Sequence, residues 1–145
     1  MTVELSASRA IDRPAQHVAE FFFDAGNNPK WQNGMRSCEW VGPGPIGVGS
    51  VYVQEASFMG RTITSRFEVT EHTPGRSITI RTIESTFPIQ VTRTVDPVDE
   101  RSCRVAARIT GGPGGVFRLF SPIIRRLAQR SVDRDYDRLV ALLTS

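Results

Sequence analysis

The chain has 145 residues, enough for one folded domain with one core and too few for two. Its formal net charge is +3, and 17 arginines, against a single lysine, are spread along the chain and nearly balanced by 15 acidic residues. This distribution argues against a nucleic-acid-binding protein, because such proteins concentrate basic residues on one surface.

The start of the chain alternates between polar and apolar residues and lacks an unbroken apolar run. We therefore expect neither a signal peptide nor a membrane-inserted segment, and we predict a cytoplasmic protein. Cys38 and Cys103 lie far apart and lack metal-ligand spacing, so both are interpreted as buried free thiols. No phosphate loop, dinucleotide fingerprint or paired-histidine motif occurs, so we predict no cofactor and no metal site.

The first part of the chain predicts one strand followed by two short helices. Residues 3–11 alternate in polarity, which is typical of a strand with one covered face. Residues 14–23 begin with a proline and carry apolar side chains on one side, which indicates a short amphipathic helix. A second short helix is expected at residues 30–35, where it carries Trp31.

Six further strands are expected between residues 37 and 110, because nearly every apolar run there alternates and is bounded by turn residues. The predicted inward phase of the second of these strands contains Val51, Val53, Glu55 and Ser57. The same phase of later strands contains Phe67, Phe87 and Arg93. Short connections between consecutive strands predict an antiparallel meander with one polar and one apolar face.

The last segment predicts one long helix from Ser121 to the C-terminus, with Ser121 as the capping residue and Pro122 in the first turn. Its apolar residues recur every three or four positions in one broad stripe: Ile124, Leu127, Ala128, Val132, Tyr136, Leu139, Leu142 and Leu143. Asp135 falls within this stripe, one turn from Ser131. Two interpretations are open: the carboxylate lies at a boundary and pairs with Arg138, or it faces a cavity.

The stripe of the helix and the apolar face of the meander both need to be covered, and each is the only plausible partner of the other. We therefore predict a single α+β domain over residues 1–145. About seven antiparallel strands curve around the C-terminal helix, and two short helices follow the first strand.

This order of elements resembles the START-like (SRPBCC) superfamily and, within it, the polyketide cyclase/dehydrase and lipid-transport type family. The marks that carry the resemblance are spread along the chain: Ile11, Arg13, Pro14 and Val18; Pro29 and Trp31; Gly47 and Gly49; Pro74 and Gly75. The resemblance implies a helix-grip fold around an apolar cavity. It also implies a small hydrophobic ligand, such as a lipid or polyketide, bound between the sheet and the helix.

Candidate ligand-binding residues are the aromatic, charged and small side chains expected to face this cavity: Trp31, Val53, Glu55, Phe67, Phe87, Arg93, Phe117, Phe120, Ser131 and Asp135. The aromatic residues admit a second interpretation, in which they only fill the core. The charges expected on inward strand phases, Arg9, Glu55, Glu84 and Arg93, would instead face water if they lie at strand ends.

Two other functions stay open at this point. The first is a polyketide cyclase or aromatase in which Asp135, Arg93 and Glu55 converge as catalytic candidates. The second is an interaction module that presents Arg126, Arg130 and Arg134 to an acidic partner or an anionic membrane surface. The sequence leaves open whether the protein forms a homodimer.

Overall fold

The computed structural model describes residues 3–58, 60–85, 88–111 and 122–145. Within them the elements follow the predicted order of one strand, short helices, six strands and a long helix: β1 (Val3–Ile11), α1 (Ala15–Phe22), the 3-10 turn η1 (Ala25–Asn27), α2 (Asn28–Trp31), β2 (Met35–Trp40), β3 (Val51–Phe58), β4 (Arg61–Thr73), β5 (Ser77–Glu84), β6 (Ile89–Pro97), β7 (Cys103–Gly111) and α3 (Pro122–Thr144). The proposed cap of the last helix, Ser121, lies outside the described residues.

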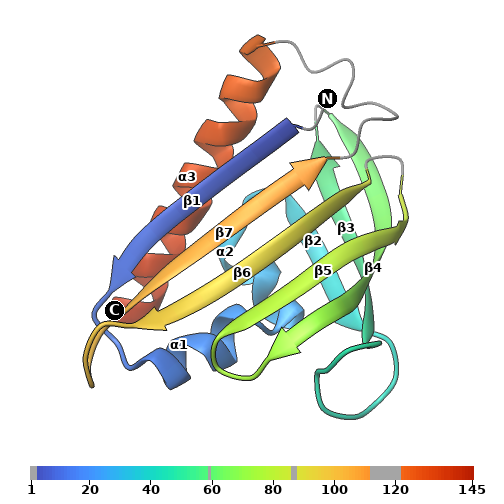
Figure 1. Ribbon diagram of the computed structural model, residues 1–145. Coiled ribbons are helices and arrows are strands. Elements are labelled where there is room, and N and C mark those ends of the chain that lie inside the picture. Colours follow the sequence, from blue (N-terminus) through green and yellow to red (C-terminus); the bar gives the residue numbers. More distant parts are fainter. Residues whose placement is uncertain (1–2, 59, 86–87, 112–121) are drawn as a thin grey trace.

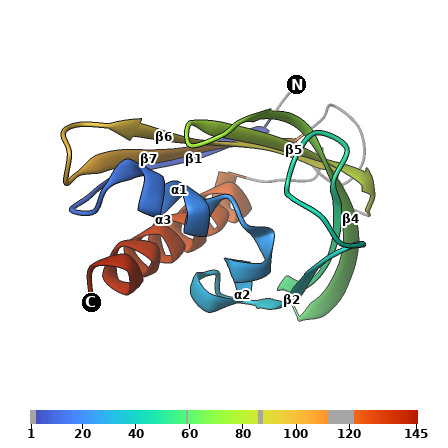
Figure 2. The same ribbon diagram turned by 90° about the horizontal axis from the view of Figure 1, so that it is seen from below.

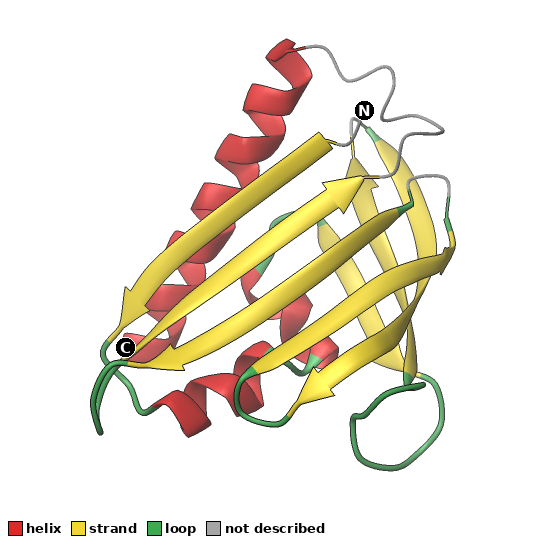
Figure 3. Ribbon diagram, in the orientation of Figure 1, coloured by secondary structure: helices red, strands yellow, loops and turns green. Residues whose placement is uncertain are grey.

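All the described strands form one antiparallel sheet in the order β1-β7-β6-β5-β4-β3-β2. The sheet curls, and α3 lies inside the curl together with α1 and α2 (Figure 1, Figure 2). Coloured by secondary structure, the helices all lie on one side of the strands (Figure 3). The predicted helix-grip architecture is confirmed.

The core lies between the inner face of the sheet and the helices. Its most deeply buried side chains, each at most 1% exposed, come from every layer: Ile11, Val18, Phe22, Trp31, Val69, Val95, Cys103, Val105 and Leu139. Both cysteines are buried free thiols, as predicted. The core therefore occupies the end of the curl where α1 and α2 lie.

The short chain segment before β2 needs a glycine. Gly34 has a φ of 82°, and a Cβ there would lie 3.0 Å from the Ser57 carbonyl oxygen. The close approach lets the Ser57 amide donate to the Gly34 carbonyl over 2.7 Å. This contact joins the end of the α2 segment to β3 and so helps to place α2 over the sheet.

Helix α3 covers the edge strand β1 with polar contacts. Gln129 accepts from the Ser6 amide at 3.2 Å and donates to the Ser6 carbonyl at 2.7 Å, which satisfies backbone groups that an edge strand leaves unpaired. Arg9 ion-pairs with Asp137 at 2.8 Å and Asp133 at 3.6 Å. The side chain of Arg9 therefore points toward α3, and the two ion pairs join β1 to the helix.

The apolar stripe of α3 is deeply buried at only some of its positions, and these lie in the second half of the helix. Tyr136, Leu139 and Leu143 are at most 8% exposed, whereas Leu127 is 58% exposed and Leu142 is 40% exposed. The prediction that the whole stripe packs on the sheet is therefore wrong at these two positions. Among the described residues, the first half of the helix contacts β1 through polar side chains such as Gln129, which is consistent with the exposure of Leu127.

Candidate functional site

A cavity of about 280 Å³ lies between the inner face of the sheet and α3. Its walls come from α2 and the segment after it, from β2 to β7, and from α3: Asn28, Gln32, Met35, Tyr52, Gln54, Phe67, Ile80, Ile89, Val91, Arg93, Ile109, Val132, Asp135 and Tyr136. Most of these side chains are hydrocarbon, thioether or aromatic groups, and a few polar groups are placed among them. A mostly apolar hollow with few polar groups is typical of a small-molecule site.

Arg93 is the cationic residue of the cavity wall. The alternation of β6 turns Val91, Arg93 and Val95 inward, and Arg93 is 7% exposed. Its Nη1 donates to the Phe22 carbonyl at 2.8 Å and to Asn28 Oδ1 at 3.0 Å. The sheet thus carries a buried charge whose position is set by the end of α1 and by α2.

Aromatic rings surround this guanidinium. Its central carbon lies 5.1 Å from the ring centroids of both Phe22 and Trp31, within the range of a cation–π contact. Trp31 also packs edge-on against Tyr136, with ring centroids 5.1 Å apart. The α2 turn therefore supplies two groups one helical turn apart, Asn28 and Trp31, that hold Arg93 in place.

Asp135 is the acidic residue of the cavity wall, and its side chain is 14% exposed. Its Oδ1 accepts from the Asn33 amide at 3.0 Å and from Arg138 Nη1 at 3.2 Å. Arg138 also donates to the Trp31 carbonyl at 2.9 Å, so the pair ties α3 to the α2 segment. Burial raises the pKa of Asp135, and the Asn33 amide and Arg138 oppose this only in part.

Replacing Asp135 by asparagine should raise the free energy of unfolding at pH 7. Since the folded-state pKa lies above the unfolded one, the ionised carboxylate destabilises the folded state, and stability falls as the pH rises through the folded pKa. Asparagine keeps an acceptor for the Asn33 amide without the charge. Urea denaturation at pH 7 and near pH 4 measures the difference in the free energy of unfolding between the variant and the parent protein. This difference should be smaller at the lower pH.

The control for this prediction is Glu55→Gln, an exposed position where the change should stay within about 0.5 kcal/mol. If Asp135→Asn were less stable than the parent at pH 7, the ion pair with Arg138 would outweigh the burial of the carboxylate, contrary to our expectation.

Two further titratable groups near the cavity are neutral at physiological pH. Burial raises the pKa of Tyr136 to about 12, with Arg93 acting in the opposite direction. Burial raises the pKa of the Cys38 thiol to about 11, opposed by its hydrogen bond from Asn28 and by Arg93. These groups can donate or accept hydrogen bonds, but neither is poised as an ionised nucleophile.

The structure brings three of the predicted site residues to the cavity wall: Phe67, Arg93 and Asp135. Trp31 is 1% exposed and packs behind Arg93 in the core instead of lining the cavity. Phe87, Phe117 and Phe120 lie outside the described residues.

The predicted orientation of β3 is wrong. Tyr52 and Gln54 line the cavity, so the alternating positions Val53 and Glu55 face outward, where Glu55 is exposed and Val53 half-buried. Both phases of this strand contain apolar residues, and alternation alone does not determine which phase turns inward. Glu55 therefore cannot converge with Arg93 and Asp135 across the cavity.

Ser131 is exposed and does not line the cavity. The buried side of α3 is centred on Val132, Tyr136 and Leu139, so Asp135 lies at its border and Ser131, one turn earlier, lies beyond it. Asp135 consequently satisfies both interpretations offered by the sequence, because it pairs with Arg138 and also lines the cavity.

Three neutral polar residues of the wall were not predicted from the sequence: Asn28, Gln32 and Gln54. Gln54 could have been found from the alternative phase of β3, in which it follows Tyr52 at a spacing of two. No comparable signal marked Asn28 in α2 or Gln32 just after it, because a single helical turn has no recognisable periodicity.

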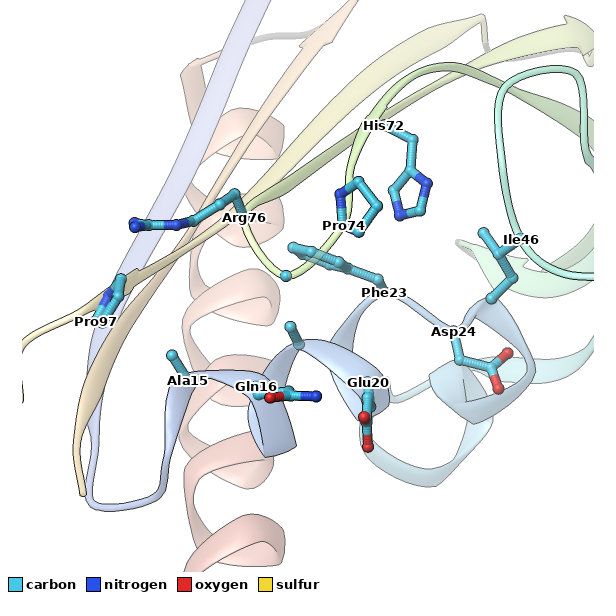
Figure 4. Close-up of a pocket in the computed structure, with 12 residues that line it drawn as sticks. Ala15, Gln16, Glu20, Phe23, Asp24, Ile46, His72, Pro74, Arg76 and Pro97 are labelled. Atoms are coloured by element: carbon cyan, nitrogen blue, oxygen red, sulfur yellow. The ribbon is translucent and has the colours of Figure 1, made fainter. Parts of the chain in front are cut away.

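A larger hollow of about 600 Å³ lies outside the sheet–helix interior, between α1 and the turns that follow β4 and β6. Figure 4 shows Phe23 at its centre, His72 and Pro74 above it, and Glu20 along α1. Glu20 and Pro74 are exposed, so this groove is open to water along its rim. We regard the interior cavity as the candidate site, because it encloses apolar surface and contains the buried charges.

In the part of the chain that the structure describes, no three His, Cys, Asp or Glu side chains lie together as a metal site requires. No described helix is both long and apolar enough to cross a membrane.

Comparisons with known proteins agree with this fold. A sequence model of the family described as polyketide cyclase / dehydrase and lipid transport matches residues 2–144. No curated protein matches the sequence significantly.

The fold also resembles several solved structures. TTHA0849 from Thermus thermophilus has a TM-score of 0.79 at 20% identity, over 98% of this chain and 97% of the other. A START superfamily protein from Mycobacterium smegmatis has a TM-score of 0.79 at 13% identity, over 97% of both chains. The Zhui aromatase/cyclase from Streptomyces sp. R1128 has a TM-score of 0.73 at 14% identity, over 99% of this chain and 92% of the other. With a family match over almost its entire length, the chain belongs to the polyketide cyclase / dehydrase and lipid transport family.

Proposed function

We propose that the protein binds one small, largely apolar molecule in the cavity between the sheet and α3. The observation that carries this proposal is the cavity itself, about 280 Å³ of space beside otherwise closely packed side chains. At about 24 cal/mol per Å³, leaving such a volume empty costs on the order of 7 kcal/mol of stability. A guest that fills the cavity recovers much of this free energy.

The size of the cavity restricts the guest. About 30 Å³ is the share of one water molecule in the liquid, so the cavity corresponds to roughly nine waters. This suits a medium-length hydrocarbon chain or a small ring system and is too little for a lipid with two long chains. The family description, which includes lipid transport, supports a hydrophobic guest without naming it.

A homologous series of straight-chain alcohols from butanol to decanol tests the proposal by calorimetric titration. Affinity should increase about fourfold with each added methylene, because burying one methylene is worth about 0.8 kcal/mol. The increase should stop once the chain fills the cavity. No binding along the series, or an affinity that keeps increasing with length as in surface adsorption, would contradict the proposal. Native mass spectrometry of the purified protein identifies any guest that it already carries.

A second candidate function is ring closure of a polyketide, as the name of the aromatase/cyclase from Streptomyces sp. R1128 suggests for that protein. The observation that favours it is that Arg93 and Tyr136, which could polarise a ketone, line the same cavity as the Asp135 carboxylate, a candidate group for proton transfer. The Asp135→Asn variant separates the two functions: a cyclase loses turnover of a poly-β-ketone thioester, whereas a binding protein keeps its affinity for the guest.

A further inference from the structure

We infer that the guest is an amphiphile with a carboxylate head, which lies against Arg93 while its hydrocarbon tail lies along the apolar part of the cavity. The inference rests on the proposed binding function and adds a charge requirement to it. Three features of the cavity support it. Arg93 has no counter-ion among the described residues, its side chain is held by several contacts, and the cavity wall changes from polar to apolar along β6.

Within the described residues, no carboxylate pairs with Arg93. Its cross-strand neighbours are Ile78 on β5 and Ala107 on β7, and both are apolar. The helices offer it the Phe22 carbonyl and the Asn28 side chain, which are neutral acceptors. The sheet and helices that pack around Arg93 therefore solvate its charge but do not neutralise it.

The acid that lines the same cavity, Asp135, is already engaged. Its carboxylate accepts from Arg138 and from the Asn33 amide, and no ion pair joins it to Arg93 in the described part of the chain. A buried guanidinium without a counter-ion is costly, because burial removes most of its hydration. An anionic guest would supply the missing charge.

The guanidinium is also held rigidly. Both Nη1 contacts and the two flanking rings restrain its position, so a guest would not have to order a long flexible side chain. The Nε–H of Arg93 has no acceptor among the described residues. The neutral hydroxyl of Tyr136 lies close enough to Arg93 for the cation to lower its pKa, and it could donate to a second oxygen.

The polarity of the wall changes along β6. Ile89, Val91 and Arg93 turn inward in succession, and at about 3.3 Å per residue the first and last of them are roughly 13 Å apart. Ile109 lies beside Val91 on the next strand, and Val132 extends the apolar part on α3. The cavity thus has a cationic end and a hydrocarbon end, which suits a single-chain carboxylate.

The test compares three molecules of equal chain length on the unaltered protein at pH 8: octanoate, octan-1-ol and methyl octanoate. Octanoate should bind at least tenfold more tightly than either neutral molecule, since hydrogen bonds between charged groups are about twice as strong as neutral ones. Arg93→Met should remove the preference for octanoate over the two neutral molecules, and Arg93→Lys should keep part of it.

The outcomes are distinguishable. Equal or weaker binding of octanoate, with clear binding of octan-1-ol, overturns the charge requirement and leaves the proposed function intact. Binding of none of the three contradicts both. If Arg93→Met does not fold, the comparison of the three molecules on the parent protein still decides the inference.

Discussion

Replacing Val132 by tryptophan should abolish binding of any guest in the cavity, with a loss of affinity of at least 100-fold. Val132 lies on α3 one turn before Tyr136 and lines the cavity, so a bulkier side chain occupies the volume that a guest needs. The indole enters existing space, and the cost of about 1–3 kcal/mol that overpacking imposes on a filled core should be largely avoided.

Calorimetric titration with octan-1-ol measures the loss, and thermal denaturation shows whether the fold is retained. The matched control is Val48→Trp in the loop before β3, where the side chain is 70% exposed and outside the cavity wall, and this variant should bind as the parent does. A folded Val132→Trp protein with unchanged affinity would show that the guest binds elsewhere, for instance in the outer groove between α1 and the β4–β5 turn.

Trp31→Ala should lower the free energy of unfolding by about 3–5 kcal/mol, the usual range for removing a buried indole. Trp31 is 1% exposed and contacts Phe22, Tyr136 and the Arg93 guanidinium, so its removal opens a void where α2, α3 and the sheet meet. This value is a large part of the total stability of a typical domain. Urea denaturation followed by circular dichroism measures it.

Trp31→Phe is the matched variant. The Nε1 of Trp31 has no hydrogen-bond partner among the described residues, so phenylalanine gives up no hydrogen bond and keeps a ring against Arg93. It should cost clearly less than the alanine variant. Equal losses for the two variants would mean that the ring contacts contribute little to stability.

The order and type of the elements were predictable because alternation, turn residues and helical periodicity are local signals. Pro74 and Gly75 mark the β4–β5 turn, where Gly75 has a φ of 76°, and the last helix begins at the expected proline. Each of these features depends on neighbouring residues in the sequence, which explains why it can be recognised without the fold.

The site was predictable only in part. Arg93 and Phe67 lie on strands with one clearly apolar phase, and the expected orientation of both is confirmed. On β3 both phases are mixed, so the choice of Glu55 instead of Gln54 was wrong. The ion-pair partners of Arg9 could not be predicted either. Arg9 pairs with Asp133 and Asp137 because of the way α3 crosses β1, and this tertiary arrangement leaves no local signal in the sequence.

The strand order has a consequence for how the protein folds. From β2 to β7 every strand pairs with its neighbour in sequence, whereas β1 pairs with β7, so that Val3 lies opposite Gly111 near the other end of the sheet-forming segment. Pairing β1 with β7 closes a long loop, which costs chain entropy before the strand pairing stabilises the fold. Contacts between residues so far apart in the sequence form late and slow folding. We therefore expect the six-strand meander to assemble first and β1 and α3 to dock together afterwards. A ligand that is present during synthesis would then meet the inner face of the sheet before α3 covers it. A ligand that arrives after folding has to enter a cavity that is already formed.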